Sequence, residues 1–246
     1  MARPTHDELA RSFDAAATVY ARARPSYPEA ALDWLLPADA REVLDLGAGT
    51  GKLTAQLVGR GLTVTAVEPS DRMRAELESA LPGVTAQSGR AEEIPLPDAS
   101  VDAVLVAQAW HWVDPARAVP EVARVLRPGG RIGLVWNRRD ERVPWVAALG
   151  RILSQPDVRA DAQRPQLGPP FAEAERFDTG AWEQPLTPDG LVELAASRSY
   201  VITLDDERRA ELLARVRALL DRPELAGRAV IAMPYVTECV RAQLPG

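Results

Sequence analysis

Val43-Leu44-Asp45-Leu46-Gly47-Ala48-Gly49-Thr50-Gly51 is the stretch that decides the fold of this chain. An apolar run carries an acid and opens into glycines at alternate positions, and residues 52–58 then have helical spacing. This pattern predicts a strand, a tight turn and a helix. Glycine reaches positive φ and places no side chain above the backbone, so a ligand can approach the amides at the helix start. We therefore expect close contact between this loop and a ligand.

Predicted strands and helices alternate on both sides of that loop. The strands are predicted at 43–46, 63–67, 84–87, 101–107 and 131–136, and the helices between them at 51–60, 70–80 and 116–126. Such alternation indicates a parallel sheet with helices on both faces, whose ligands bind beyond the carboxyl ends of the strands. The residues expected at that edge are 45–51, Glu68, 89–92 and 108–112.

We interpret residues 1–246 as one domain with a Rossmann-like, doubly wound α/β fold. Two further strands predicted at 176–182 and 228–235 bring the mostly parallel sheet to seven strands, and further helices are predicted at 145–153, 188–196 and 206–220. The interpretation has four parts, which are a helical cap at 1–40, a cofactor-binding core at 41–137, an insertion or lid at 138–180, and C-terminal elements at 181–246 that complete the sheet.

Composition and charge exclude several classes of function. The formal net charge is -6 and the isoelectric point is about 5.1, which argues against a surface that neutralises nucleic-acid phosphates. The single cysteine, Cys239, excludes an internal disulfide and a thiolate metal site, and we expect it to be a small buried apolar residue. The sequence has no run of about 20 apolar residues, and because its first residues form no apolar core we expect no secretory leader. We expect no metal, no membrane contact and a cytoplasmic location.

Spacing distinguishes between the ligands that a glycine loop can hold. A phosphate-binding P-loop is excluded because Leu46 and Leu53 occupy its first glycine and its hydroxyl position. A dinucleotide fingerprint is weakened, because Lys52 stands where its third glycine belongs. The chain instead has Asp-x-Gly-x-Gly-x-Gly, and an acid, Glu68, follows Gly47 by 21 residues at the end of the next predicted strand.

With these features, residues 40–137 resemble the class I methyltransferases that use S-adenosylmethionine. The resemblance implies that the glycine loop contacts the methionine portion of this cofactor, and that Asp45 meets its ammonium group directly or through water. It also implies that Glu68 accepts hydrogen bonds from both ribose hydroxyls, because a carboxylate offers two acceptor oxygens. The cofactor-binding residues implied here are Asp45, Gly47, Ala48, Gly49, Gly51, Glu68 and Pro69.

Two later segments extend the resemblance. Residues 89–102 are similar to the family's segment whose Ala-Glu pair lies at the adenine, which implies that role for Ala91 and Glu92. Residues 108–114, Gln-Ala-Trp-His-Trp-Val-Asp, lie where the family's fourth strand faces the sulfonium methyl, which adds Gln108 to the cofactor-binding residues. The amino-group nucleic-acid methyltransferases carry Asn/Asp-Pro-Pro-aromatic at this position, and this chain does not.

The N-terminal segment and the Trp-His-Trp block look like the methyltransferase type 11 branch that includes trans-aconitate methyltransferase-like enzymes. On that resemblance, Tyr20 and Arg24 fold over the cofactor and meet its carboxylate. The alternative for both is an ordinary packed aromatic and a solvated base. His6, in the terminal segment, is expected to be inert.

The implied reaction is the transfer of a methyl group to a small-molecule acceptor by in-line displacement. A carboxylate acceptor needs no base, whereas for a hydroxyl His111 is a candidate base; alternatively, its ring is only held between Trp110 and Trp112, which either line the acceptor pocket or pack. Arg138 and Arg139, directly after the fifth strand, hint at an anionic acceptor. Two other functions remain open, which are a non-catalytic nucleotide-binding protein and a nicotinamide-dependent oxidoreductase.

Overall fold

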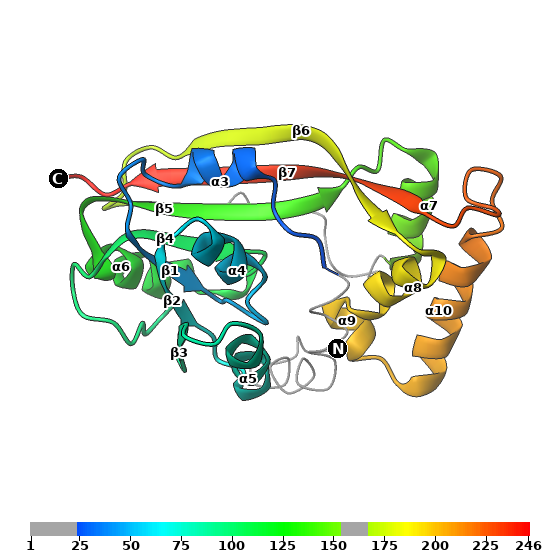
Figure 1. The fold of residues 1–246 in the computed structure, drawn as a ribbon, viewed down its shortest axis with the longest axis horizontal. Helices are drawn as coiled ribbons and strands as arrows, with labels where there is room; N and C mark the ends of the chain where they lie inside the picture. Colours follow the sequence, from blue (N-terminus) through cyan, green and yellow to red (C-terminus); the bar gives the residue numbers. More distant parts are fainter. Residues whose placement is uncertain (1–23, 154–166) are drawn as a thin grey trace. The chain divides into compact units, whose positions relative to one another are not determined.

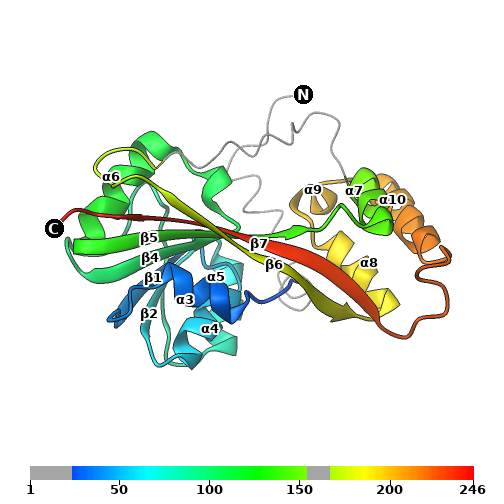
Figure 2. The same cartoon turned by 90° about the horizontal axis from the view of Figure 1, so that it is seen from above.

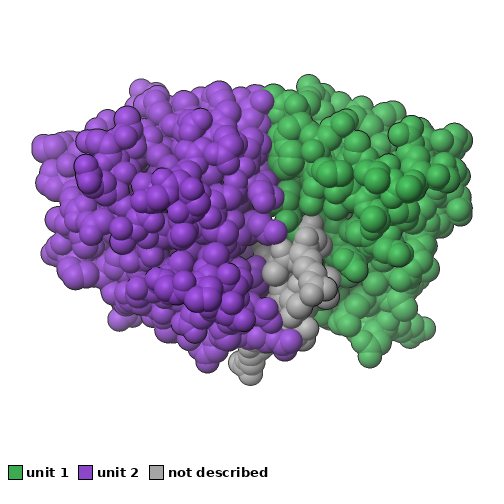
Figure 3. All heavy atoms as spheres, in the orientation of Figure 1, with its two compact units in different colours: residues 1–25, 138–161, 180–236 green, residues 26–137, 162–179, 237–246 purple. Residues whose placement is uncertain are grey.

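The computed structural model describes residues 24–153 and 167–246. Residues 1–23 of the predicted helical cap, which include His6 and Tyr20, lie outside the described residues. The chain divides into two compact units, which Figure 3 colours separately. Unit 1 contains residues 1–25, 138–161 and 180–236, and unit 2 contains residues 26–137, 162–179 and 237–246.

A seven-stranded sheet with the order β3-β2-β1-β4-β5-β7-β6 organises the fold. β1 pairs in parallel with β2 and β4, and the pairs β2/β3 and β4/β5 are also parallel. β7 runs opposite to β5 and β6 (Figure 1). The expectation of a mostly parallel, seven-stranded sheet is confirmed. The strands are β1 Glu42–Leu46, β2 Thr63–Val67, β3 Thr85–Gln87, β4 Val101–Ala107, β5 Leu126–Arg139, β6 Glu175–Leu186 and β7 Ile231–Gln243.

Unit 2 has helices on both faces of the sheet, because successive strand side chains point to opposite faces. Leu44 and Leu46 of β1 belong to the same buried cluster as Val122, on the helix that covers one face. Val43 belongs to another cluster with Leu32 and Leu57, on helices of the opposite face. Figure 2 shows α6 on one side of the strands and α3 and α4 on the other. The helices of unit 2 are α3 Glu29–Leu35, α4 Lys52–Gly59, α5 Asp71–Ala80 and α6 Pro115–Val125.

Two helix starts of unit 2 are capped by side chains. Ser70 caps α5 as predicted, since its hydroxyl accepts a hydrogen bond from the Met73 N–H at 3.2 Å. Asp114 caps α6 by accepting from the Ala116 N–H at 3.0 Å, and Pro115 follows at the first helical position. These caps fix where α5 and α6 begin.

Unit 1 has its own apolar core. Trp145 of α7 is buried with Leu191 of α8, Val216 of α10 and Met233 of β7. The backbone N–H of Asp140 donates to the Pro234 carbonyl at 2.9 Å. The interpretation of residues 138–180 as an insertion or lid within a single domain stays a prediction. The helices are α7 Pro144–Leu153, α8 Pro188–Ala196, α9 Ser199–Ile202 and α10 Asp206–Leu219.

The last three strands are longer than the sequence predicts. The Arg127-Pro-Gly-Gly stretch reads as a turn, but β5 begins at Leu126 and runs through it as an irregular stretch opposite β4, with a register shift between Val101 and Ala103. Gly129 supplies a positive φ of 78° there. β7 continues to Gln243, and buried residues such as Thr237, Val240 and Ala242 recur among the polar ones of its second half. Cys239 is buried in this strand, as expected.

Candidate functional site

The glycine loop after β1 has a backbone that side chains would disturb. Gly47, Gly49 and Gly51 have φ of 73°, 57° and 83°. A Cβ on Gly47 would lie 2.9 Å from the Ala109 Cβ, and one on Gly51 would lie 2.8 Å from the Leu77 Cγ. The Gly47 N–H donates to the Val67 carbonyl at 2.8 Å, and the neighbouring Ala48, whose side chain packs in the core, donates to the same carbonyl. The loop is therefore held at the ends of β2 and β4. This is the edge of the sheet where ligands bind in folds of this kind, beyond the carboxyl ends of the strands.

Glu68 lies at the end of β2 and contacts this loop through its side chain. One carboxylate oxygen accepts from the Gly49 N–H and the other accepts from the Ser70 N–H, each at 3.0 Å. The side chain is buried at 7% exposure. Pro69, between the two anchored residues, is half-buried. The acid that the sequence singled out is thus held beside the bare backbone of the loop.

Asp45 is fully buried beneath the loop. Its Oδ2 accepts a hydrogen bond from the Thr54 hydroxyl of α4 at 2.6 Å, while its Oδ1 has no hydrogen-bond partner. Burial raises the pKa of Asp45 to about 7, hydrogen bonding from Thr54 opposes that rise, and the charge of Glu68 adds to it. The position of this acid under α4 makes it a link between strand and helix. Its contact with a cofactor ammonium stays a prediction.

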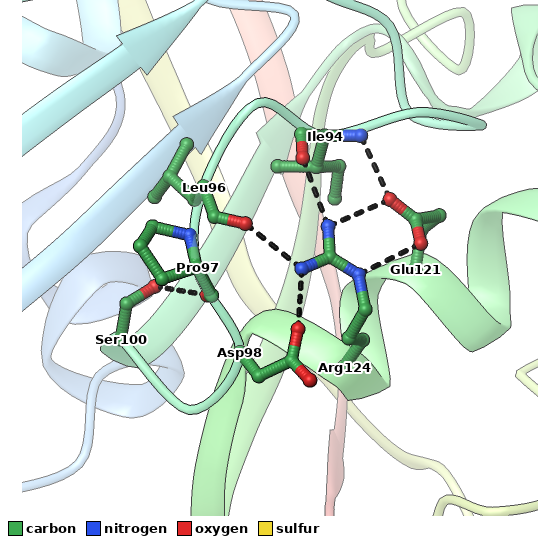
Figure 4. A network of polar contacts seen from close by, with 7 residues as sticks. All are labelled: Ile94, Leu96, Pro97, Asp98, Ser100, Glu121 and Arg124. Carbon is green, nitrogen blue, oxygen red and sulfur yellow. Dashed lines mark hydrogen bonds and ion pairs between the residues drawn. The ribbon is translucent and has the colours of Figure 1, made fainter.

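Arg124 of α6 holds the segment that carries Ala91 and Glu92. Its guanidinium donates to the carbonyls of Ile94 and Leu96 at 2.9 and 2.8 Å. Figure 4 shows this network, which Asp98 and Glu121 complete from either side of the guanidinium. The same Glu121 accepts from the Ile94 N–H at 2.9 Å. The carboxylates of Asp98 and Glu121 balance the charge of Arg124, which holds the backbone of residues 94–96 in place.

Ala91 and Glu92 themselves are anchored to α6 and its cap. Ala91 is buried at 6% exposure in the same apolar cluster as α6. The Glu92 carboxylate accepts from the Asp114 N–H at 2.8 Å. The two residues therefore lie on a segment joined to the start of α6, and their role at the adenine stays a prediction.

Gln108 follows β4 with a strained backbone. Its φ of 59° is unusual for a residue with a side chain, and such strain concentrates at functional positions. The side-chain amide donates to the Asn137 carbonyl at 3.4 Å. Asn137 in turn donates to the Ser26 carbonyl at 3.1 Å and accepts from the buried Thr237 hydroxyl at 2.6 Å. The end of β4 is thereby joined to β5, β7 and the segment before α3.

The Trp-His-Trp block forms the single turn η1 Trp110–Trp112, in which the three residues have different surroundings. Trp110 packs in the core at 3% exposure, and its indole N–H is buried without a hydrogen-bond partner. His111 is exposed, and its ring lies 4.6 Å from that of Trp112, which is 43% exposed. Trp110 therefore supports the end of β4 from within. The roles of His111 as a base and of both tryptophans at an acceptor pocket stay predictions.

Arg24 is the one residue of the described candidate set that belongs to unit 1. Its guanidinium donates to the Ser197 carbonyl at 3.2 Å. The other described candidates belong to unit 2, where hydrogen bonds join Glu68 to the loop and Gln108 to Asn137. The contact of Arg24 with a cofactor carboxylate stays a prediction.

Sequence reasoning missed several residues that position the site. Thr54, Arg124 and Asn137 make their contacts across 9, 30 and 100 residues of sequence. Only Thr54 has a local signal, because a hydroxyl one helical turn inside α4 faces the preceding strand. Within residues 24–153 and 167–246, no three His, Cys, Asp or Glu side chains gather as a metal site. In the same ranges no helix is long and apolar enough to cross a membrane.

Comparison with known proteins agrees with this geometry. A family model described as a methyltransferase domain matches residues 44–134. An uncharacterized methyltransferase of Mycobacterium tuberculosis is 58% identical over 238 residues, which cover 96% of this chain and 97% of that protein. A solved structure of a candidate type II methyltransferase from Anaeromyxobacter dehalogenans has 29% identity and a TM-score of 0.58, with coverage of 91% and 99%.

A more distant structure shares the fold alone. Phosphoethanolamine N-methyltransferase 2 of Haemonchus contortus, solved with S-adenosyl-L-methionine, is 17% identical with a TM-score of 0.57 and covers 100% of this chain and 61% of that one. The glycine loop, the acid after β2 and the sheet order define the class I methyltransferase fold. This chain belongs to the methyltransferase family.

Proposed function

We propose that this protein transfers a methyl group from S-adenosylmethionine to a small-molecule acceptor that carries a carboxylate or a hydroxyl. The observation that carries the proposal is the contact between the Glu68 carboxylate and the Gly49 N–H, because it brings a buried acid to a backbone without side chains. In this proposal the Glu68 carboxylate binds the ribose diol of the cofactor, and the bare backbone of the loop binds its amino-acid portion. The two surfaces therefore have to lie side by side. The Haemonchus relative of this fold, whose structure contains S-adenosyl-L-methionine, supports the same cofactor.

The residues present fit this cofactor. Gly47 and Gly49 leave the loop backbone bare, with φ values that other residues rarely adopt. Each carboxylate oxygen of Glu68 accepts one backbone N–H, and such an oxygen accepts a further hydrogen bond from a hydroxyl. The partnerless Oδ1 of Asp45 is an acceptor beneath the loop for an ammonium group or a water.

The protein contributes mainly by holding the reacting groups. Bound S-adenosylmethionine supplies a methyl group that is already activated on a positively charged sulfur. An in-line displacement then requires the acceptor to be held close and aligned, a contribution that reaches about 7–11 kcal/mol in favourable cases. The strained Gln108 and the buried Trp110 fix the end of β4, where the acceptor is expected. For a hydroxyl acceptor, His111 takes the proton, whereas a carboxylate acceptor has none to lose.

Two measurements test the proposal. Calorimetric titration compares S-adenosylmethionine and S-adenosylhomocysteine with NAD, and we expect the first two to bind and NAD not to bind. Incubation with methyl-labelled cofactor and a panel of small acids, phenols and amines then detects the labelled product. Binding of NAD alone would favour an oxidoreductase, and cofactor binding without any labelled product would favour a protein that only binds the cofactor.

A further inference from the structure

Asp45 and Thr54 form a buried polar pair between β1 and α4 of unit 2. Both residues have 0% exposure, and the Thr54 hydroxyl donates to Oδ2 of Asp45 at 2.6 Å. The residues in register with Asp45 on the neighbouring strands are Ala66 of β2 and Leu105 of β4, which are both buried. The hydrogen bond from Thr54 therefore reaches the carboxyl group in apolar surroundings.

A link between strand and helix does not require an acid at this position. The link uses one oxygen of Asp45, and a neutral acceptor would serve for it. The other oxygen, Oδ1, is buried without a hydrogen-bond partner. In the described part of the chain, no arginine, lysine or histidine forms an ion pair with Asp45. Because a buried acid in this state is costly, the arrangement favours a cationic ligand that can reach Oδ1.

Glu68 and Lys52 are the charged residues that border this pair on β2 and α4. Burial raises the pKa of Asp45 to about 7, and the negative charge of Glu68 adds to the rise. Lys52 begins α4, where burial lowers its pKa, and it forms no ion pair with Asp45. Hydrogen bonding from Thr54 acts in the opposite direction and favours the ionised form of Asp45. Thr54 is therefore the residue that helps to keep this carboxyl group charged.

We propose that Thr54 is a positioning residue for the cofactor, because its hydroxyl holds Oδ2 of Asp45 and leaves Oδ1 to accept from the cofactor's ammonium group. This inference rests on the proposed function, since it assigns a role within the binding of S-adenosylmethionine. When the ammonium group binds, a protonated Asp45 releases its proton to solvent, and the carboxylate that remains pairs with the cation. Thr54 favours this step, because a hydroxyl that donates to a carboxylate stabilises its ionised form.

The test measures the affinity of the full-length protein for S-adenosylhomocysteine, which carries the same ammonium group, between about pH 5.5 and 7.5. Wild-type affinity should rise about tenfold per pH unit at first and level off near pH 7, where Asp45 becomes ionised. Thr54→Val keeps the side-chain shape without the hydroxyl, so this levelling should move upward by about one to two pH units. Affinity at pH 7 should fall about 5- to 50-fold as a result. Thr54→Ser keeps the hydroxyl and should retain the wild-type profile.

Thr237→Val is the matched control. Thr237 is also fully buried, and its hydroxyl donates over the same 2.6 Å, but to the amide oxygen of Asn137, which does not titrate. The control should lose stability as Thr54→Val does and keep the wild-type pH profile of binding. A purely structural role of Thr54 would lower the affinity by one factor at every pH, whereas a role through the charge of Asp45 moves the pH at which the affinity levels off.

Each outcome has a separate meaning. Profiles of wild type and Thr54→Val that level off at the same pH overturn the inference, as does a shift that Thr54→Ser shows equally. Wild-type protein that binds no S-adenosylhomocysteine at any pH overturns the proposed function, and the inference with it. Thermal unfolding of each variant is measured first. If Thr54→Val does not fold, Asp45→Asn provides a second measurement, since its affinity should be weaker and independent of pH, and a wild-type profile in that variant overturns the inference.

Discussion

The Glu68 carboxylate accepts a hydrogen bond from the Gly49 N–H at 3.0 Å, and this contact joins the end of β2 to the loop after β1. Because the second oxygen of Glu68 is held by the Ser70 N–H, the side chain has one defined position. The protein's own hydrogen bonds thus hold both surfaces that are expected to contact the cofactor. Such preorganisation lowers the entropy cost of binding.

The first prediction concerns the charge of Glu68. Glu68→Gln keeps the shape of the side chain but leaves only one acceptor oxygen, so either a ribose hydroxyl or a backbone N–H loses its partner. We expect about 10- to 100-fold weaker binding of S-adenosylhomocysteine, since a hydrogen bond to a charged group contributes about 1.5–3 kcal/mol. Calorimetry measures the change against Glu78→Gln on the exposed face of α5. Equal affinities in the two variants would contradict the placement of the ribose at Glu68.

The second prediction concerns the bare backbone of the loop. Gly49 has a φ of 57°, and only the Met73 sulfur, at 3.9 Å, lies within reach of an added Cβ. Gly49→Val should therefore fold with a modest loss of stability while its branched side chain blocks the cofactor. We expect S-adenosylhomocysteine binding to fall more than about 100-fold, because atoms of ligand and side chain would overlap.

A matched control separates backbone strain from obstruction at Gly49. Gly61 has a φ of 79° and no atom within 4 Å of an added Cβ, so Gly61→Val imposes similar strain of about 1–2 kcal/mol away from the loop. Both variants should lose a few degrees of melting temperature, but only Gly49→Val should lose ligand affinity. A parallel loss of affinity in both would attribute the effect to strain.

The third prediction concerns the pH dependence that the buried Asp45 imposes. Its folded-state pKa, about 7, lies above the unfolded value, so the stabilisation due to its protonated form is complete below about pH 4 and is lost as the pH rises through 7. Asp45→Asn stays neutral throughout. The stability of the variant relative to wild type should therefore increase by on the order of 3 kcal/mol between pH 4.5 and 7.5. Urea unfolding of both proteins at these two pH values measures the difference, and a constant difference would show that Asp45 titrates normally.

The fourth prediction concerns Arg124 as a positioning residue. Arg124→Gln removes the bonds to the carbonyls of Ile94 and Leu96 and leaves Glu121 without its cation. We expect a loss of about 2 kcal/mol in the free energy of unfolding, since two backbone acceptors lose a charged donor. Affinity for S-adenosylhomocysteine should fall severalfold, because Ala91 and Glu92 precede the released segment. Arg117→Gln, exposed on the same helix, should change neither quantity; a stability loss without any loss of affinity would restrict Arg124 to a structural role.

The parts of the fold that follow from local sequence were predictable. The glycine loop, the cap at Ser70 and the acid Glu68 depend on neighbours within a few residues, and a periodic pattern identifies the strands beside them. The extent of β5 was not predictable, because Pro128 and Gly129 favour a turn in isolation. In the structure, β4 pairs with the residues on either side of this stretch, and the Leu244 N–H donates to the Gly130 carbonyl. The family resemblance supplied most of the candidate site residues, whose roles stay predictions, whereas the packing of Trp110 depends on segments distant in sequence.

β5, β6 and β7 each give residues to both units, so each unit consists of three separate stretches of the chain. No single cut in the gene yields either unit as a continuous polypeptide. Exchanging unit 1 between relatives would require crossovers inside three strands, and each crossover would have to preserve the strand register. We expect the two units to have diverged together in this lineage through point substitutions, and not through recombination of whole modules.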